Sequence, residues 1–295
     1  NNKEIKMPRK KSSKKKYPKK KSEFNKFFDK IFVINLFDKT KRWKKVSSQF
    51  KRRGITAERF IAIDGRCKSQ GDKACEQKLK TFEMIYNVNI PAKTKKDNGK
   101  VYPLKELVPA SSLTIGTILL LRAQVKNKWK RMLICEDDIE LSRNIEKKLK
   151  QGISELPKSW DLLYLGCGNM CGGNGIDDEY SRKNKYESQL NEFMGDDIYV
   201  QYKNDLRYPC DEKCKPITEH LSIAYNPGGT WCYAYSLKGA RKMLKLLGKN
   251  AGEHIDKLIG QQTKNKKMKA IAFDPPIVMH EGGALRSDSD IPWEW

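Results

Sequence analysis

Short apolar runs alternate with helical patterns along this chain, and this alternation limits its possible folds more than any other feature. Residues 31–36 (IFVINL) form a continuous apolar run, short enough for a strand that is buried on both faces. A helical pattern follows, with Trp43, Val46 and Phe50 on one face, and residues 59–63 (RFIAI) predict a second strand. Strand, helix and strand with short connections predict a right-handed parallel βαβ unit.

The same alternation returns in the second half of the chain. Further strands are predicted at residues 132–135, 162–165, 231–235 and 270–273, and helices at 113–129, 142–149 and 236–247. The residues expected to cap or stop the helices are Asp38 or Thr40, Ser142, Ser236, Gly54 and Gly248. Together these patterns predict an α/β domain with a mostly parallel sheet.

The length of 295 residues is ample for a buried core. We expect a basic, disordered tail at residues 1–24, followed by a single domain at 25–295. Two polar, irregular segments, near 66–108 and 176–220, are expected to be long loops or insertions over the sheet.

Positive charge is concentrated at the start of the chain. Residues 1–21 hold 11 Lys or Arg and one Glu, so they contribute +10 of the formal net charge of +24 and leave +14 for the rest. The segment is either a nuclear-localisation or polyanion-binding patch or a solubilising linker. Because the sequence lacks base-stacking motifs and zinc fingers, a nucleic acid is the less favoured partner.

Membrane and secretory segments are not predicted. The longest apolar stretch, near residues 113–121, is shorter than the roughly 20 residues that a spanning helix needs, and it contains Gly116 and Thr117. The basic start leads into no apolar segment, so we predict no signal peptide and expect a cytoplasmic protein by default. The first residue is Asn rather than Met, which leaves a targeting segment upstream as an open question.

Three acids, Glu136-Asp137-Asp138, directly follow the apolar strand at residues 132–135. Ligands of open α/β sheets bind at the carboxyl ends of the strands, and alternation along an extended chain points Glu136 and Asp138 to one side. Two such carboxylates repel each other unless a cation lies between them, and hard oxygen donors suit Mg²⁺ or Mn²⁺. The alternative is an acidic loop at the N-terminus of the next helix.

Two later motifs have less specific contexts. His280 lies between Pro275-Pro276 and Glu281-Gly282-Gly283, and it either completes a metal site or is an ordinary hydrogen-bonded histidine. His220 and His254 are assigned no metal role. Gly228-Gly229-Thr230 precedes a predicted strand, where two glycines would let the backbone approach a ligand closely, although a simple turn gives the same pattern.

Four of the cysteines form two close pairs, Cys167 with Cys171 and Cys210 with Cys214. Since no signal peptide is predicted, we rank free thiols first for these pairs and disulfides second. Zinc ranks last, because the spacing within each pair is looser than in typical zinc sites.

Six blocks of the sequence, in their order along the chain, closely resemble glycosyltransferase family 25. The blocks are IFVINLFDKTKRWKKVSSQFKRRGI, RFIAIDG, MLICEDDIEL, DLLYLG, GTWCYAYSLKGARKML and HIDKLIG. This family contains bacterial lipooligosaccharide galactosyltransferases and animal collagen hydroxylysine galactosyltransferases. The resemblance covers most of residues 30–285 and fits a viral or microbial member of the collagen type.

The resemblance implies an A-type nucleotide-sugar fold, with a Rossmann-like central sheet and helices on both faces. It also implies inverting transfer from a UDP-sugar with Mn²⁺ or Mg²⁺, held by Asp138 first, Glu136 second and His280 third. The acceptor hydroxyl must lose a proton as it attacks, and Asp256 in the HID segment is the expected base, with helix capping or acceptor binding as its alternative role. The expected donor-binding residues are Asn35, Leu36, Arg42, Asp64, Gly65, Asp137, Gly229 and Thr230.

One block departs from the family. Members usually carry a Gly-Cys and then a Ser-His pair in the helix before the acidic motif, whereas residues 116–121 here read GTILLL. Donor choice is therefore left between UDP-galactose and UDP-glucose. The expected acceptor is hydroxylysine or galactosyl-hydroxylysine of a collagen-like protein, or a glycan. The alternatives are a polyanion-binding protein that acts through its Lys-rich tail and a catalytically inactive scaffold.

Overall fold

The computed structural model describes residues 22–67, 71–91, 99–167, 216–274 and 276–280. Its centre is a seven-stranded sheet with the order β2-β1-β3-β7-β5-β8-β6. Strands β1, β2, β3, β5 and β8 run in one direction, while β6 and β7 run against them, so the expected mostly parallel sheet is confirmed. The strands span Lys30–Asn35 (β1), Glu58–Ile61 (β2), Arg131–Cys135 (β3), Leu162–Gly166 (β5), Leu221–Ile223 (β6), Cys232–Ser236 (β7) and Ala270–Phe273 (β8).

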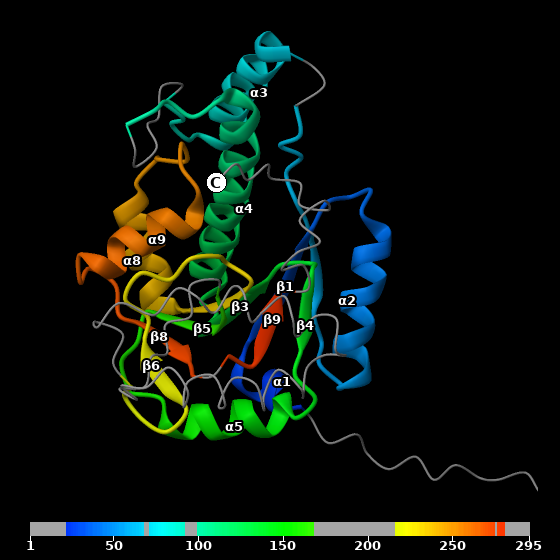
Figure 1. Ribbon diagram of the computed structural model, residues 1–295, viewed down its shortest axis with the longest axis vertical. Helices are drawn as coiled ribbons and strands as arrows, with labels where there is room; N and C mark the ends of the chain where they lie inside the picture. The colour runs from blue at the N-terminus through cyan, green and yellow to red at the C-terminus, as the bar shows by residue number, and fades with distance from the viewer. Residues whose placement is uncertain (1–21, 68–70, 92–98, 168–215, 275, 281–295) are drawn as a thin grey trace, which may run out of the picture.

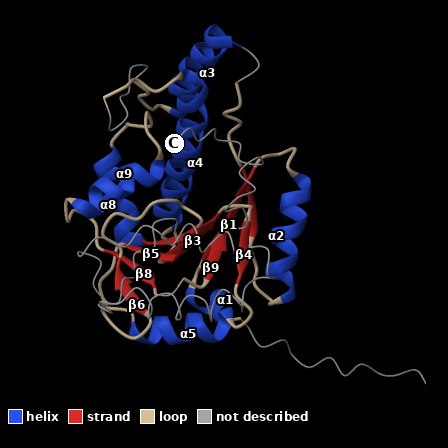
Figure 2. Cartoon of the chain, viewed as in Figure 1, coloured by secondary structure: helices blue, strands red, loops and turns tan. Residues whose placement is uncertain are grey.

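Helices cover both faces of this sheet (Figures 1 and 2). One face carries α1 (Glu23–Phe27), α2 (Thr40–Arg52) and α5 (Ile145–Glu155). The other carries α3 (Gly71–Tyr86), α4 (Leu104–Asn127), α8 (Leu237–Leu247) and α9 (Ile255–Lys264). Successive strand residues alternate between the two cores: Met132 and Ile134 of β3 belong to the α4 side, and Leu133 and Cys135 to the α2 side. Burial on both faces explains why β3, β5 and β8 are continuous apolar runs, whereas the edge strand β2 is only half-buried.

A small second sheet lies beside the first. Strand β4 (Ile139–Leu141) pairs antiparallel with β9 (Val278–His280), and the register sets Ile139 opposite His280. This pairing brings the segment after the acidic motif beside residues 278–280, the last residues that the structure describes.

Helix α4 is the central helix of the α4 side and packs against α3, α8 and α9. It is the one helix of the described residues that is long and apolar enough to cross a membrane, but 78% of its most apolar window is buried inside the protein. Its apolar composition is accounted for by that burial.

Some predicted helix ends are confirmed and others are wrong. Ser236 caps α8 by accepting a hydrogen bond from the Gly239 N–H at 2.9 Å, and Gly248 ends that helix with φ 58°. Helix α2 instead starts after Lys39 and α5 after Asn144, and neither start has a side-chain cap. Asp38 and Ser142 contribute backbone carbonyls there, which accept from Thr40 N–H at 2.8 Å and Ile145 N–H at 3.3 Å.

The segment at 66–108 is not the irregular loop that we expected. It contains the 16-residue helix α3, which buries Cys75, Leu79 and Phe82 on one face, and a disulfide joins Cys67 to Cys75. The many charged residues around these three positions obscured an ordinary i, i+4, i+7 apolar pattern. The same segment also includes the beginning of α4.

The other expectations about organisation fall largely outside the described residues. These are the basic segment 1–21 and most of the predicted insertion at 176–220. Helix α1 begins at Glu23, inside the tail predicted for residues 1–24, and Phe24 is fully buried. Cys171, Cys210 and Cys214 also lie outside, whereas Cys167 is among the described residues and is buried.

Candidate metal and donor site

The carboxyl edge of β3 brings two of the predicted motifs together. Glu136 directly follows β3, and its N–H donates to the Trp231 carbonyl at 2.8 Å. Because β7 runs antiparallel to β3, the residues that precede β7 lie at this same edge. The Thr230 hydroxyl donates to Glu136 Oε1 at 2.6 Å, so the glycine motif and the acidic motif are in direct contact.

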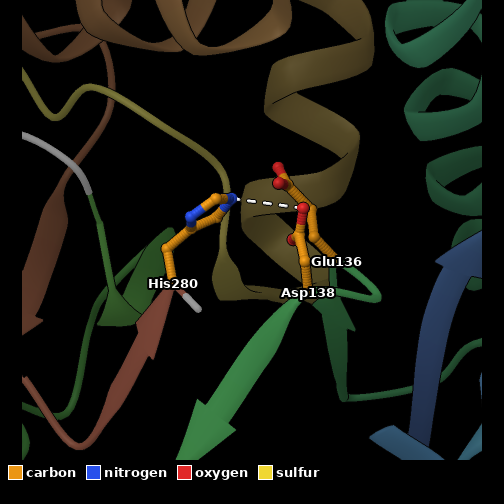
Figure 3. Close-up of side chains that lie close together, drawn as sticks. All are labelled: Glu136, Asp138 and His280. Atoms are coloured by element: carbon orange, nitrogen blue, oxygen red, sulfur yellow. Dashed lines mark ion pairs between the residues drawn. The ribbon is translucent and has the colours of Figure 1, made fainter. Parts of the chain in front are cut away.

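Glu136, Asp138 and His280, the three residues predicted to bind a metal, lie close together and are called the triad below. One ligand atom from each lies within 4.8 Å of the others, and Asp138 Oδ2 is 3.2 Å from His280 Nε2 (Figure 3). In the β4–β9 ribbon, His280 pairs with Ile139, the residue directly after Asp138. This pairing places the histidine beside the aspartate. Trp231 also packs on the His280 ring, with 5.5 Å between ring centroids.

The triad fits a divalent cation. Asp138 Oδ1 is buried and has no hydrogen-bond partner among the described residues, so its lone pairs are left for a ligand. Two carboxylates and one imidazole suit Mn²⁺, which accepts both oxygen and nitrogen, and they suit Mg²⁺ less well because Mg²⁺ prefers oxygen alone.

The charges of the triad depend strongly on one another. Burial and the nearby charge of Asp138 raise the pKa of Glu136 to about 7. Burial also disfavours ionised Asp138, but the His280 hydrogen bond and charge outweigh it and lower the pKa of Asp138. Burial opposes the charged imidazole as well, yet Asp138 and Glu136 raise the pKa of His280 overall.

Asp137 points to the β1 side of the motif. Its Oδ2 accepts from the Asn35 side-chain amide, and its Oδ1 is 3.4 Å from Arg42 Nη1. The same Arg42 nitrogen is 3.7 Å from Asp138 Oδ2. Burial raises the pKa of Asp137, although Asn35 and Arg42 both act to lower it. Three of the predicted donor-binding residues are thus held in one cluster.

Arg59 is a residue of this cluster that the sequence analysis missed. Its Nε donates to Asn35 Oδ1 at 2.7 Å, and its Nη2 donates to the carbonyls of Leu36 and Phe37, each at 2.9 Å. The register sets Arg59 of β2 opposite Val33 of β1. One signal in the sequence could have identified Arg59: it is a charged residue at the start of an apolar strand.

Asp64 and Gly65 have different surroundings from those expected. Both carboxylate oxygens of Asp64 bind the Arg66 guanidinium, at 2.9 and 2.7 Å, and this hydrogen bonding lowers the pKa of Asp64. Gly65 lies tightly against α4, where an added Cβ would meet Ser112 Oγ at 2.5 Å and Pro109 Cα at 2.6 Å. The structure therefore gives Gly65 a packing role, while its predicted donor contact stays a prediction.

Asp256 lies across the glycine turn from the triad. It is in the first turn of α9, and its Oδ2 accepts from the Gly229 N–H at 3.2 Å while its Oδ1 accepts from the Lys257 N–H at 2.8 Å. Gly229 has φ 69°, a conformation that favours glycine. Consecutive residues, Gly229 and Thr230, thus contact the proposed base and a proposed metal ligand.

A second group of possible ligands contains Glu155, Glu219 and His220. His220 Nδ1 is 2.5 Å from Glu155 Oε1, and the His220 N–H donates to Glu155 Oε2 at 3.0 Å. Two hydrogen bonds between the end of α5 and the residue before β6 account for these contacts.

The chain matches a known protein family. Residues 28–259 match the family model described as "Glycosyltransferase family 25 (LPS biosynthesis protein)", a range that includes the acidic motif and Asp256 but ends before His280. No curated protein matches the chain. Because the match covers well over half of the 295 residues, the chain belongs to glycosyltransferase family 25.

Proposed function

We propose that this glycosyltransferase is metal-dependent and inverting, and that it moves galactose or glucose from a UDP-sugar to a hydroxyl acceptor. The acceptor would be hydroxylysine or galactosyl-hydroxylysine of a collagen-like protein, or a glycan. The observation that carries the proposal is the convergence of Glu136, Asp138 and His280, with the buried Asp138 Oδ1 unpaired among the described residues.

Glu136, Asp138 and His280 would hold a Mn²⁺ or Mg²⁺ ion. Such an ion would offset the negative charge that develops on the departing UDP. Thr230 keeps Glu136 oriented through its 2.6 Å hydrogen bond, and Arg42 brings a fixed positive charge beside both aspartates. These residues provide charge that is already oriented before the donor binds.

Asn35 and Asp137, held by Arg59 and Arg42, are the proposed donor-binding cluster at the end of β1. Leu36 belongs to the same cluster, because its carbonyl accepts a hydrogen bond from Arg59. We also propose Asp64, Gly229 and Thr230 as donor contacts, whereas Gly65 supports its segment by packing against α4.

Asp256 is the proposed general base. Its carboxylate accepts two backbone hydrogen bonds, which hold it in place beside the glycine turn. There it would accept the proton of the acceptor hydroxyl as that oxygen attacks the sugar.

The test is UDP release from UDP-galactose and from UDP-glucose with Mn²⁺, with and without a hydroxylysine peptide. Asp138→Ala should lower turnover at least 100-fold. Glu155→Gln, which alters the other carboxylate–histidine pair, is the matched control and should keep wild-type turnover. Wild-type protein that neither turns over a UDP-sugar with metal nor binds UDP would refute the proposal. Salt-sensitive DNA binding that survives deletion of residues 1–21 would favour the polyanion-binding alternative.

A further inference from the structure

Two buried cysteines face each other across the central strands β3 and β7, at the end of β3 that leads into Glu136. Cys135 ends β3, Cys232 begins β7, and the antiparallel register pairs them directly. Their Sγ atoms are 2.8 Å apart, and both residues have 0% of their surface exposed. The separation is less than 1 Å beyond the covalent sulfur–sulfur distance of about 2.05 Å.

The backbone pairing at this position suits a cross-strand disulfide. The Glu136 N–H donates to the Trp231 carbonyl, so the neighbouring pair, Glu136 with Trp231, is a hydrogen-bonded pair. Pairs alternate along an antiparallel ladder, which makes Cys135 and Cys232 a non-hydrogen-bonded pair. Cα atoms of such pairs are about 4.5 Å apart, inside the range of about 4.4–6.8 Å that disulfides span.

The other described cysteines do not compete for these two. Cys67 and Cys75 are already joined to each other. Cys167 belongs to the hydrophobic core on the α4 side, whereas Cys135 and Cys232 belong to the core on the α2 side. Within the described part of the chain, each of the two therefore has the other as its only thiol neighbour on that side of the sheet.

We propose that Cys135 and Cys232 form a structural disulfide that joins β3 to β7. Because both sulfurs are fully buried in the folded chain, the bond forms during folding, while the strands are still accessible to a disulfide oxidant such as oxidised glutathione. One cysteine thiolate attacks the oxidant and releases one glutathione. The second thiolate then attacks the mixed disulfide, forms the Cys135–Cys232 bond and releases the second glutathione. The two cysteines are oxidised, the oxidant is reduced, and two protons pass to the two glutathiones.

The bond would hold together the strand ends that carry the candidate site. Glu136 is the next residue after Cys135, and Thr230, which hydrogen-bonds Glu136, lies two residues before Cys232. The inference itself rests on the sheet register and the sulfur positions, and it is independent of the proposed reaction.

The first experiment is peptide mapping of the full chain, refolded in a glutathione redox buffer and digested with trypsin and chymotrypsin without reduction. We expect a peptide with Cys135 linked to one with Cys232, alongside the Cys67–Cys75 link, which shows that the sample was oxidised. Free Cys135 or Cys232 beside an intact Cys67–Cys75 link, or a link from either to another cysteine, would overturn the proposal.

Thermal unfolding gives an independent measurement. In a Cys67→Ala, Cys75→Ala background, a phosphine reductant should lower the Tm by roughly 5–15 °C, the effect of a typical disulfide in a chain of this size. The same reductant should leave the Tm unchanged when Cys135→Ala is added to that background. Equal changes in Tm on reduction, with and without Cys135→Ala, would show that no disulfide between Cys135 and Cys232 stabilises the protein.

Discussion

Gly65 lies against the N-terminal part of α4, and we predict that Gly65→Ala lowers the stability of the protein. The added Cβ would meet Pro109 Cα at 2.6 Å, the Val108 carbonyl oxygen at 2.9 Å and Ser112 Oγ at 2.5 Å. Two of these three atoms belong to the helix backbone, and the Ser112 hydroxyl is itself hydrogen-bonded to the Pro109 carbonyl at 2.7 Å. A side-chain rotation therefore cannot relieve the contact, and the segment or the helix has to move.

The magnitude follows from what overpacking costs in a close-packed interior. Forcing one extra methyl group into such a contact destabilises a protein by about 1–3 kcal/mol. For a domain of this size, that corresponds to a fall in Tm of roughly 3–10 °C. Gly116→Ala is the matched control, because Gly116 is inside α4 and its added Cβ would be 3.5 Å from Phe60, an ordinary contact. That substitution should be neutral or stabilise by up to about 1 kcal/mol, since alanine favours the helix.

The assay is thermal unfolding of both variants, together with UDP affinity measured by titration calorimetry at a temperature where both are folded. We expect Gly65→Ala to lower the Tm and to retain UDP affinity within about threefold. An unchanged Tm with a lost UDP affinity would refute the packing role and favour the predicted donor contact of Gly65.

Four further outcomes test the site. Thr230→Val should weaken Mn²⁺ binding about tenfold, because it removes a hydrogen bond of about 1.5 kcal/mol to a charged group, while Thr230→Ser should retain it. Protons compete with metal for Glu136, whose pKa is about 7, so Mn²⁺ affinity in calorimetry should fall as the pH drops below 7 and level off above about 8. Asp256→Asn should lower kcat by about 100-fold or more with little change in donor KM, because the Asn oxygen can still accept from Gly229. Arg59→Lys should weaken UDP binding about tenfold, since lysine cannot serve Asn35 and the two carbonyls together.

Six of the seven strands of the main sheet were predictable because their signal is local, whereas β6 and the two strands of the small sheet were not predicted. A continuous apolar run indicates burial on both faces, and the two cores confirm this residue by residue in β3, whereas the edge strand β2 is only half-buried. The position of Glu136 at the carboxyl edge followed from the same pattern. Ser236 was identified correctly as a cap because the helix begins directly after it, whereas α5 begins three residues beyond Ser142.

The features that assemble the triad had no local signal. The direction of β7 is set by its neighbours β3 and β5, and the apolar run at 231–235 is the same for either direction. The β4–β9 ribbon pairs strands of three residues each, from distant parts of the chain. The family resemblance could therefore indicate His280 as a metal ligand. The pairing of Ile139 with His280 in the structure explains how the histidine comes to lie beside Asp138.

The missing Ser-His pair acquires a specific interpretation from the position of residues 116–121. They lie inside α4, and all but Leu119 are buried. Thr117, in that stretch, has its hydroxyl 3.2 Å from the Tyr233 hydroxyl of β7, so this part of the helix packs beneath the strand that follows the glycine motif. The side-chain hydrogen bonds and ion pairs of Glu136 and Asp138 among the described residues come from Thr230, Arg42 and His280, and none of these is in this stretch. The departure from the family pattern therefore lies in the packing below β7, away from the side chains of Glu136 and Asp138.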